Sequence, residues 1–296
     1  MSSILSRARR NLAHPIDGGS GVPMPRARRG IVIGVTGPTG APGRTFLSIN
    51  LAAALVTQGQ RVVLVDADPH LGAVAVLLDL AEDRSLIYLA HEAALQAVDD
   101  GLVVRHIQTV FGLDVLTGRS VAGLGEIVPS PFLVEVISIL RRRYDVVVMD
   151  VGALDCEAAQ TAALLSQLVV WVVVPTKLGI DLLDRTLAGP LAAQVRTRAS
   201  LTILNRLGPP GLREVEHALR ARYGLPVAGA VPDQRQACIE AEDRGRPAVM
   251  GGGLAKPILR CAREITAALR GSRFDSQDAA ATDVKLGGEY IGDTSS

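Results

Sequence analysis

The sequence predicts a doubly wound α/β fold, a mostly parallel sheet with helices on both faces. Short runs rich in valine and isoleucine alternate along the chain with longer segments of helical periodicity. Several short runs are apolar at every position, as in Val146–Met149, which is typical of strands covered on both faces. Apolar residues make up 48% of the chain and aromatic residues only 3%, so we expect a core of Val, Leu, Ala and Ile between these layers.

The predicted elements follow one another from residue 31 to residue 269. Strands are expected at Ile31–Thr36, Arg61–Val65, Leu113–Thr117, Asp145–Asp150, Leu168–Pro175, Leu201–Asn205 and Val227–Val231. Helices are expected at Thr45–Gln58, Pro131–Arg143, Asp155–Ser166, Asp181–Arg198, Leu212–Tyr223 and Lys256–Leu269. The first helix ends just before Gly59, and glycine favours the left-handed turn that closes many helices.

The two ends of the chain differ from this pattern in composition and charge. Residues 1–29 carry six arginines against one aspartate, and residues 271–296 carry five acids against two bases. Because both segments are polar and rich in Gly or Ser, we expect a basic N-terminal tail and an acidic C-terminal tail around one domain, residues 30–270. The basic tail is predicted either to bind an anionic surface, membrane or DNA, or to be a solvated leader.

Composition also excludes several classes of protein. The formal net charge is +1, and Cys156, Cys238 and Cys261 are scattered without a histidine at ligand spacing. These facts argue against a polycation, a disulfide framework and a zinc site. The longest apolar run, Leu168–Pro175, is far shorter than the ~20 residues of a membrane-spanning helix. Since no signal peptide is recognised either, we expect a cytoplasmic protein.

A loop rich in Gly and Pro links the first predicted strand to the first predicted helix. Its backbone N–H groups and the helix N-terminus are expected to converge on an anion. Arg44 would supply a cation to the β- and γ-phosphates of a nucleotide, and the Thr45 hydroxyl would bind Mg²⁺. The usual phosphate-loop pattern has Gly where this chain has Pro38, and Lys where it has Arg44. A plain glycine-rich turn is the alternative for this segment taken alone.

Acidic residues follow two further predicted strands at the same edge of the sheet. Asp66 and Asp68 come at the end of one strand, and Asp150 at the end of another. Ligands of open parallel sheets bind at this carboxyl edge, where an acid often holds phosphate-bound Mg²⁺. Each acid alone could cap a helix or form a turn, but three of them beside a Gly-rich loop indicate a nucleotide site.

Taken together, these motifs resemble those of the ParA/MinD family of P-loop ATPases. Gly40–Thr45 is similar to the family's Lys-Gly-Gly-x-Gly-Lys-Thr loop, Val63–Pro69 to its switch I strand, and Val147–Gly152 to its Walker B strand. Leu204–Arg206 and Gly229–Gln234 resemble two segments that lie beside adenine in the family. The resemblance spans roughly residues 30–270 and implies a P-loop NTPase type of fold that binds ATP and Mg²⁺.

The resemblance also implies a role for each matching residue. Around the phosphates would lie Thr39, Gly40, Ala41, Pro42, Gly43, Arg44 and Thr45. Thr45 would bind Mg²⁺ directly, and Asp66 and Asp150 would hold the metal through water. Asp68 would orient the attacking water, with Arg44 as the second catalytic residue. Around the adenine would lie Asn205, Arg206, Pro232 and Asp233; for Asn205, a turn at the strand end is the alternative.

The chain departs from the family at two lysines. The lysine that reaches across the family's dimer to the partner's ATP is replaced by Thr39, and the phosphate-loop lysine by Arg44. The only lysines of the chain are Lys177, Lys256 and Lys285. Arginine can bind a phosphate through two N–H groups but does not reproduce a point charge. The sequence therefore predicts nucleotide binding, and leaves open whether ATP is hydrolysed weakly or not at all.

Proteins of this family act as switches, in which ATP promotes a homodimer that binds a surface and hydrolysis releases it. The loop is most similar to that of actinobacterial CpaE/TadZ-like and septum-site-determining relatives. This implies a positioning switch with a partner protein of a pilus, septum or partition system, at a polar, septal or peripheral membrane location. One alternative is a degenerate scaffold that does not hydrolyse ATP. The other is a partition ATPase that binds DNA non-specifically, for which Arg141–Arg143, Arg196 and Arg198 are candidates unless they form solvated helix ends.

Overall fold

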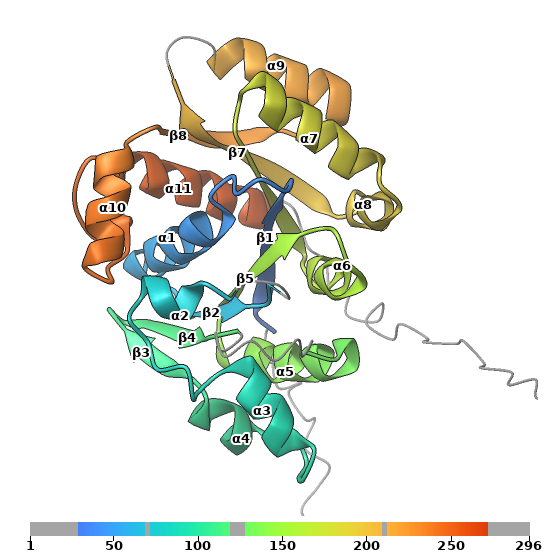
Figure 1. Ribbon diagram of the computed structural model, residues 1–296, viewed down its shortest axis with the longest axis vertical. Coiled ribbons are helices and arrows are strands. Elements are labelled where there is room, and N and C mark those ends of the chain that lie inside the picture. The colour runs from blue at the N-terminus through green and yellow to red at the C-terminus, as the bar shows by residue number, and fades with distance from the viewer. Residues whose placement is uncertain (1–28, 69–71, 119–127, 209–211, 272–296) are drawn as a thin grey trace, which may run out of the picture.

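In the computed structural model, eight strands of the described residues form a single sheet (Figure 1), in the order β3-β4-β2-β5-β1-β6-β7-β8. The structure describes residues 29–68, 72–118, 128–208 and 212–271. The strands are β1 (Ile31–Gly37), β2 (Val62–Asp66), β3 (Gln108–Val110), β4 (Leu113–Leu116), β5 (Val146–Ala153), β6 (Leu168–Val173), β7 (Ala199–Leu207) and β8 (Val227–Pro232). All neighbouring pairs are parallel except β3 with β4. The predicted mostly parallel, doubly wound sheet is confirmed.

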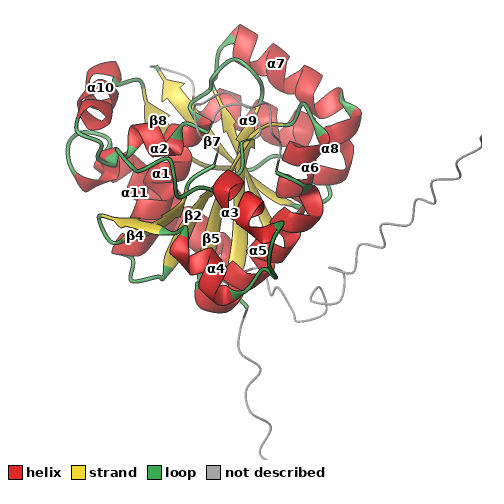
Figure 2. Ribbon diagram, turned by 60° about the horizontal axis from the view of Figure 1, so that its bottom comes forward, coloured by secondary structure: helices red, strands yellow, loops and turns green. Residues whose placement is uncertain are grey.

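Helices cover both faces of this sheet (Figure 2). The longer ones are α1 (Arg44–Thr57), α5 (Ser130–Arg143), α7 (Lys177–Ala188), α9 (Leu212–Tyr223) and α11 (Ala255–Gly271). The shorter ones are α2 (Val74–Leu77), α3 (Leu86–Ala93), α4 (Asp100–Arg105), α6 (Glu157–Leu164), α8 (Pro190–Val195), α10 (Arg235–Asp243) and the 3₁₀ helix η1 (Ala248–Met250).

Two apolar clusters, one on each face, form the core. Successive residues of β1 divide between them, because strand side chains alternate in direction: Val32 joins one cluster and Ile33 the other. The cluster of Ile33 includes residues of α1, η1 and α11, and that of Val32 includes residues of α5, α6, α7 and α9. Both faces of the central strands are therefore buried, as the uninterrupted apolar runs predict.

The strand order places a ligand crevice at the carboxyl end of β1. β1 lies between β5 and β6, and the chain builds β2 and β4 on one side of it and β6, β7 and β8 on the other. In open parallel sheets, ligands bind outside the carboxyl ends of the strands where the strand order reverses in this way. The Gly- and Pro-rich loop after β1 begins at this point.

The prediction of one helix over Asp181–Arg198 is wrong. α7 ends at Ala188 and α8 begins at Pro190, with Gly189 extended between them at φ −69° and ψ 150°. Proline lacks the N–H that a helix interior needs and disfavours the helical conformation in the preceding residue. The Gly189-Pro190 pair therefore divides this segment into two helices.

Both predicted tails fall largely outside the described residues. Of residues 1–29 and 271–296, the structure describes only Arg29, which precedes β1, and Gly271, which ends α11. Within the described ranges, no helix is both long enough and apolar enough to cross a membrane.

Candidate functional site

The loop between β1 and α1 has the backbone of an anion-binding loop. Gly40, Ala41 and Gly43 have positive φ angles of 89°, 52° and 94°, a region that glycine enters without strain. α1 begins after Gly43 without a side-chain cap and without an acidic residue in its first turn. The N–H groups at this helix end are therefore available to an anion, which the helix dipole also favours.

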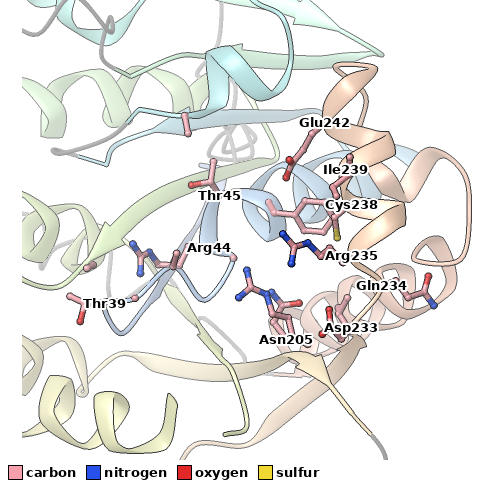
Figure 3. A pocket seen from close by; sticks show the side chains of 18 of the residues that line it. Thr39, Arg44, Thr45, Asn205, Asp233, Gln234, Arg235, Cys238, Ile239 and Glu242 are labelled. Atoms are coloured by element: carbon pink, nitrogen blue, oxygen red, sulfur yellow. The ribbon is translucent and has the colours of Figure 1, made fainter. Parts of the chain in front are cut away.

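The Arg44 side chain lies against its own loop. Its Nη1 donates a hydrogen bond of 2.6 Å to the carbonyl oxygen of Pro38. A guanidinium has five N–H donors, so Arg44 can bind phosphate oxygens through the others while Pro38 fixes its position. In Figure 3 the Arg44 side chain lies on the loop side of the cavity, away from α10.

Asp150 of β5 is completely buried beneath the loop. The Ser48 hydroxyl of α1 donates to its Oδ1 at 3.2 Å, whereas its Oδ2 has no hydrogen-bond partner among the described residues. Burial raises the pKa of Asp150 to about 6, and the nearby Thr45 hydroxyl, the Arg44 charge and Ser48 partly oppose that rise. Buried polar atoms without a partner are rare in folded proteins, and a cation held beside Thr45 would satisfy this one.

Asp66 lies beside Asp150, directly opposite it in the pairing of β2 with β5. Its side chain is buried, and its two oxygens accept the N–H groups of Asp68 at 3.3 Å and of Val74 at 3.2 Å. Burial, and then the charge of Asp150, raise the pKa of Asp66 well above its ordinary value. Asp66 therefore anchors both ends of the segment that leads from β2 to α2.

The Asp68 carboxylate lies against the backbone of Gly152. A Cβ atom on Gly152 would come within 2.6 Å of Asp68 Oδ2, and Gly152 has a φ of 75°. Both facts require glycine at this position. Asp68 is half-buried and lines the cavity described below, unlike Asp66.

Asn205 connects β7 to the phosphate loop. Its Nδ2 donates a hydrogen bond of 2.7 Å to the carbonyl oxygen of Pro42, and its side chain is buried. The next residue, Arg206, has a φ of 55° and lies where the pairing of β7 with β8 shifts register. Non-glycine residues in this strained region occur often at ligand sites.

A cavity of about 850 Å³ lies beside the phosphate loop (Figure 3). Its volume lies within the range of small-molecule sites. The predicted site residues that line it are Thr39, Gly40, Ala41, Gly43, Arg44, Thr45, Asp68, Asn205, Arg206, Pro232 and Asp233. Three others, Pro42, Asp66 and Asp150, are buried and do not line it. The structure thus brings together in one place the residues that the motifs predict from four distant segments.

One wall of the cavity is absent from the sequence prediction. Arg235, Cys238, Ile239 and Glu242 line it from α10, and their spacing of three, four and seven residues puts them on one face of the helix. Figure 3 shows the Arg235 side chain turned toward the cavity. The spacing could have identified this face, but polar residues occupy positions where an apolar stripe normally marks a helix.

The basic run Arg141–Arg143 makes local contacts. Arg141 Nε donates to the carbonyl oxygen of Gly30 at 2.9 Å. Arg142 and Arg143 form ion pairs with Asp100 at 3.5 and 3.0 Å. These contacts hold the end of α5 to neighbouring segments of the chain. They give no support to a DNA-binding role for the run.

A family model and several known proteins are similar to this chain. The family model of the CobQ/CobB/MinD/ParA nucleotide binding domain matches residues 33–248. The septum site-determining protein MinD of Synechocystis sp. is 28% identical over 236 residues, covering 77% of this chain and 85% of that protein. EpsB of Ralstonia solanacearum, named as a tyrosine-protein kinase, is 35% identical over 117 residues, 39% of this chain. The chain matches only 15% of the length of EpsB.

Solved structures share the fold. The cell division ATPase MinD of Pyrococcus furiosus superposes with a TM-score of 0.67 at 25% identity, over 81% of this chain and 99% of that one. MinD of Pyrococcus horikoshii, solved in complex with Mg-ADP, gives a TM-score of 0.66 at 22% identity, over 81% and 97% of the two chains.

Proposed function

This chain belongs to the CobQ/CobB/MinD/ParA nucleotide-binding family, and we propose that it is an ATP- and Mg²⁺-dependent switch that positions a partner protein. The relatives that support this include the septum site-determining MinD of Synechocystis sp.. Within the family, the similarity of the Gly40–Thr45 loop to CpaE/TadZ-like proteins favours a partner from a pilus or septum system. The proposal includes an ATP-dependent homodimer in the cytoplasm that binds a polar, septal or membrane surface.

The buried Oδ2 of Asp150, which no described residue satisfies, carries the nucleotide part of this proposal. Mg²⁺ at phosphate sites keeps several waters and uses one or two protein groups. The described part of the chain holds no group of three or more His, Cys, Asp or Glu side chains that could bind a metal ion. Thr45 would bind the metal directly, and Asp150 and Asp66 through water. When bound, Mg²⁺ would neutralise charge on the phosphates.

The remaining residues of the cavity would hold the nucleotide and act on it. The N–H groups of the loop and the free donors of Arg44 would bind the phosphates. Asp68, held against Gly152, would orient a water molecule for attack on the γ-phosphate. Asn205, Arg206 and the residues after β8 would surround the adenine at the far end of the cavity.

A second function, a scaffold that binds ATP and hydrolyses it little or not at all, is supported by two observations. Thr39 is exposed where the family has its dimer-bridging lysine, so no ammonium group reaches a partner's phosphates from there. Arg44 already donates one N–H to Pro38, which reduces its freedom to follow the moving phosphate.

ATP turnover by the purified full chain distinguishes these functions. We measure it for the wild type and for Thr39→Lys, alone and with duplex DNA or anionic vesicles. A switch gives measurable turnover that one of the surfaces stimulates, and Thr39→Lys increases it by restoring the missing cation. Thr197→Lys, at another exposed threonine, controls for added charge. ATP binding without turnover in all samples identifies the scaffold, and absence of ATP binding overturns both.

A further inference from the structure

Four basic residues lie along one exposed face of α11. Lys256, Arg260, Arg263 and Arg270 are all exposed, and their spacing of four, three and seven residues aligns them along one side of the helix. The opposite side, with Ile258 and Ile265, is buried in the core. At about 1.5 Å per residue, the basic face is about 21 Å long.

The cations of this face have no acidic partner among the described residues. Arg142, Arg143 and Arg222, in contrast, form ion pairs with acids of neighbouring helices. Glu264 is the one acid exposed on α11 beside the basic face, and it forms no ion pair with the described residues either. The face therefore presents a net charge of about +3 to whatever lies against it.

The charge of the segment that follows α11 is complementary. Residues 272–296 carry Asp275, Asp278, Asp283, Glu289 and Asp293 against Arg273 and Lys285, a net charge of −3. The segment is joined to the end of the basic face, so its local concentration there is high. Its 25 residues can extend up to about 80 Å, far more than they need to turn back along α11.

We propose that the acidic segment 272–296 binds the basic face of α11 in the same chain. α11 exposes no large apolar side chain that would insert into a membrane, since the exposed large hydrophobic residues of the described chain all lie outside α11. A tethered polyanion of matching charge fits the face instead. Bound there, the segment shields α11, and any other polyanion has to displace it.

The scarcity of lysine makes this contact directly measurable. A carbodiimide joins a carboxylate to a primary amine, and Lys256 is the only lysine of the described residues apart from Lys177. We expect peptides that link Lys256 to acids of 272–296 in the full chain at about 10 mM salt. The yield should fall about fivefold or more at about 1 M salt, because the Debye length drops from about 30 to about 3 Å. Lys177 provides an internal comparison on a different helix.

Two variants keep the result interpretable. Lys256→Arg retains the charge and should remove these peptides. Arg142→Lys places an amine beside Asp100 and should give links to Asp100 but not to the acidic segment. Equal coupling of the segment to Lys177 and Lys256, or coupling at Lys256 that salt does not change, would overturn the proposal. A mixture of ¹⁴N- and ¹⁵N-labelled chains identifies links between two copies, and links found mainly between copies would overturn it as well.

A binding assay tests the other possible occupants of the face. Replacing the five acids of 272–296, each Asp by Asn and Glu289 by Gln, removes a competing polyanion. The affinity of the full chain for a 30-base-pair DNA duplex should then increase by about fivefold at low salt. Arg260→Ala with Arg263→Ala should reverse that increase. If duplex DNA or anionic vesicles bind through these arginines equally well with the acidic segment intact, the segment does not occupy the face.

Discussion

The Asn205 side chain donates a 2.7 Å hydrogen bond to the carbonyl oxygen of Pro42, which precedes it by 163 residues. This bond joins the end of β7 to the loop that begins α1. It fixes the loop from the side on which the adenine is proposed to bind. Phosphate loop and base site are therefore parts of one connected structure.

Asn205→Ala is expected to weaken both the fold and ATP binding. It leaves the Pro42 carbonyl oxygen without its donor, which costs about 1–3 kcal/mol of unfolding free energy for a buried group. Denaturant unfolding and calorimetric titration with ATP measure the two effects. Thr202→Val on the same strand is the control, because the buried Thr202 hydroxyl has no partner among the described residues. It should leave ATP affinity unchanged and stability equal or higher.

Gly43→Ala should reduce ATP affinity well beyond its effect on stability. Gly43 has a φ of 94°, and an added Cβ would overlap the Asn205 amide nitrogen. Gly59 has a similar φ of 81° but no atom within 4 Å of the added Cβ. Gly59→Ala should therefore cost about 1 kcal/mol of folding free energy through backbone strain alone. Equal ATP affinity in the two variants would show that the space around Gly43 is not used by the nucleotide.

The variants Asp68→Ala and Asp68→Asn should still bind ATP but lose most of its hydrolysis. A group that orients water contributes to the transition state and little to ground-state binding. We expect a drop in kcat of about 10²-fold or more, with a change in ATP affinity of about twofold or less. Single-turnover assays and equilibrium titration separate the two quantities. Parallel losses in both would assign Asp68 to metal binding or to the structure of the loop instead.

The metal-free protein should lose stability as pH rises from about 4 to about 6. The pKa of Asp150 is raised to about 6 by burial, so the folded state holds a proton that the unfolded state releases near pH 4. Because the folded state binds more protons in this window, the unfolding free energy decreases with rising pH, and the raised pKa of Asp66 acts in the same direction. Thermal unfolding measured between about pH 4 and about pH 6 checks this loss of stability.

Two comparisons test the origin of that slope. Asp150→Asn cannot release a proton and should flatten it. Mg²⁺ with ATP would favour the ionised carboxylates, which hold it through water, and should restore stability above about pH 6. A slope that is unchanged in Asp150→Asn would place its origin in other groups.

Much of the fold could be predicted because its signals are local. Val146–Met149 is apolar at every position, which indicates a strand buried on both faces, and β5 lies at the centre of the sheet. The loop around Gly43 and Arg44 and the aspartates at strand ends can likewise be recognised from short stretches of sequence. The signal for the break between α7 and α8 is also local, since Gly189-Pro190 is a strong helix-breaking pair.

What could not be predicted depends on contacts between distant segments. The bond from Asn205 to Pro42 requires β7 to lie two strands from β1, which no local pattern specifies. Asp66 and Asp68 are two residues apart, yet only Asp68 reaches the cavity, because the path after β2 turns Asp66 inward to bind backbone N–H groups. Similarly, the sequence gives no clear signal for α10, because this helix has no buried residue and hence lacks the apolar stripe that marks a helix in sequence.

Calorimetric titration of the full chain with ATP tests most directly whether the cavity beside Arg44 and Asp150 binds ATP with Mg²⁺. We predict a dissociation constant below about 1 mM in the presence of Mg²⁺. Binding should be weaker without the metal, and Gly43→Val should abolish it. No heat of binding at millimolar ATP with Mg²⁺, in protein shown to be folded, would show that this cavity is not an ATP site.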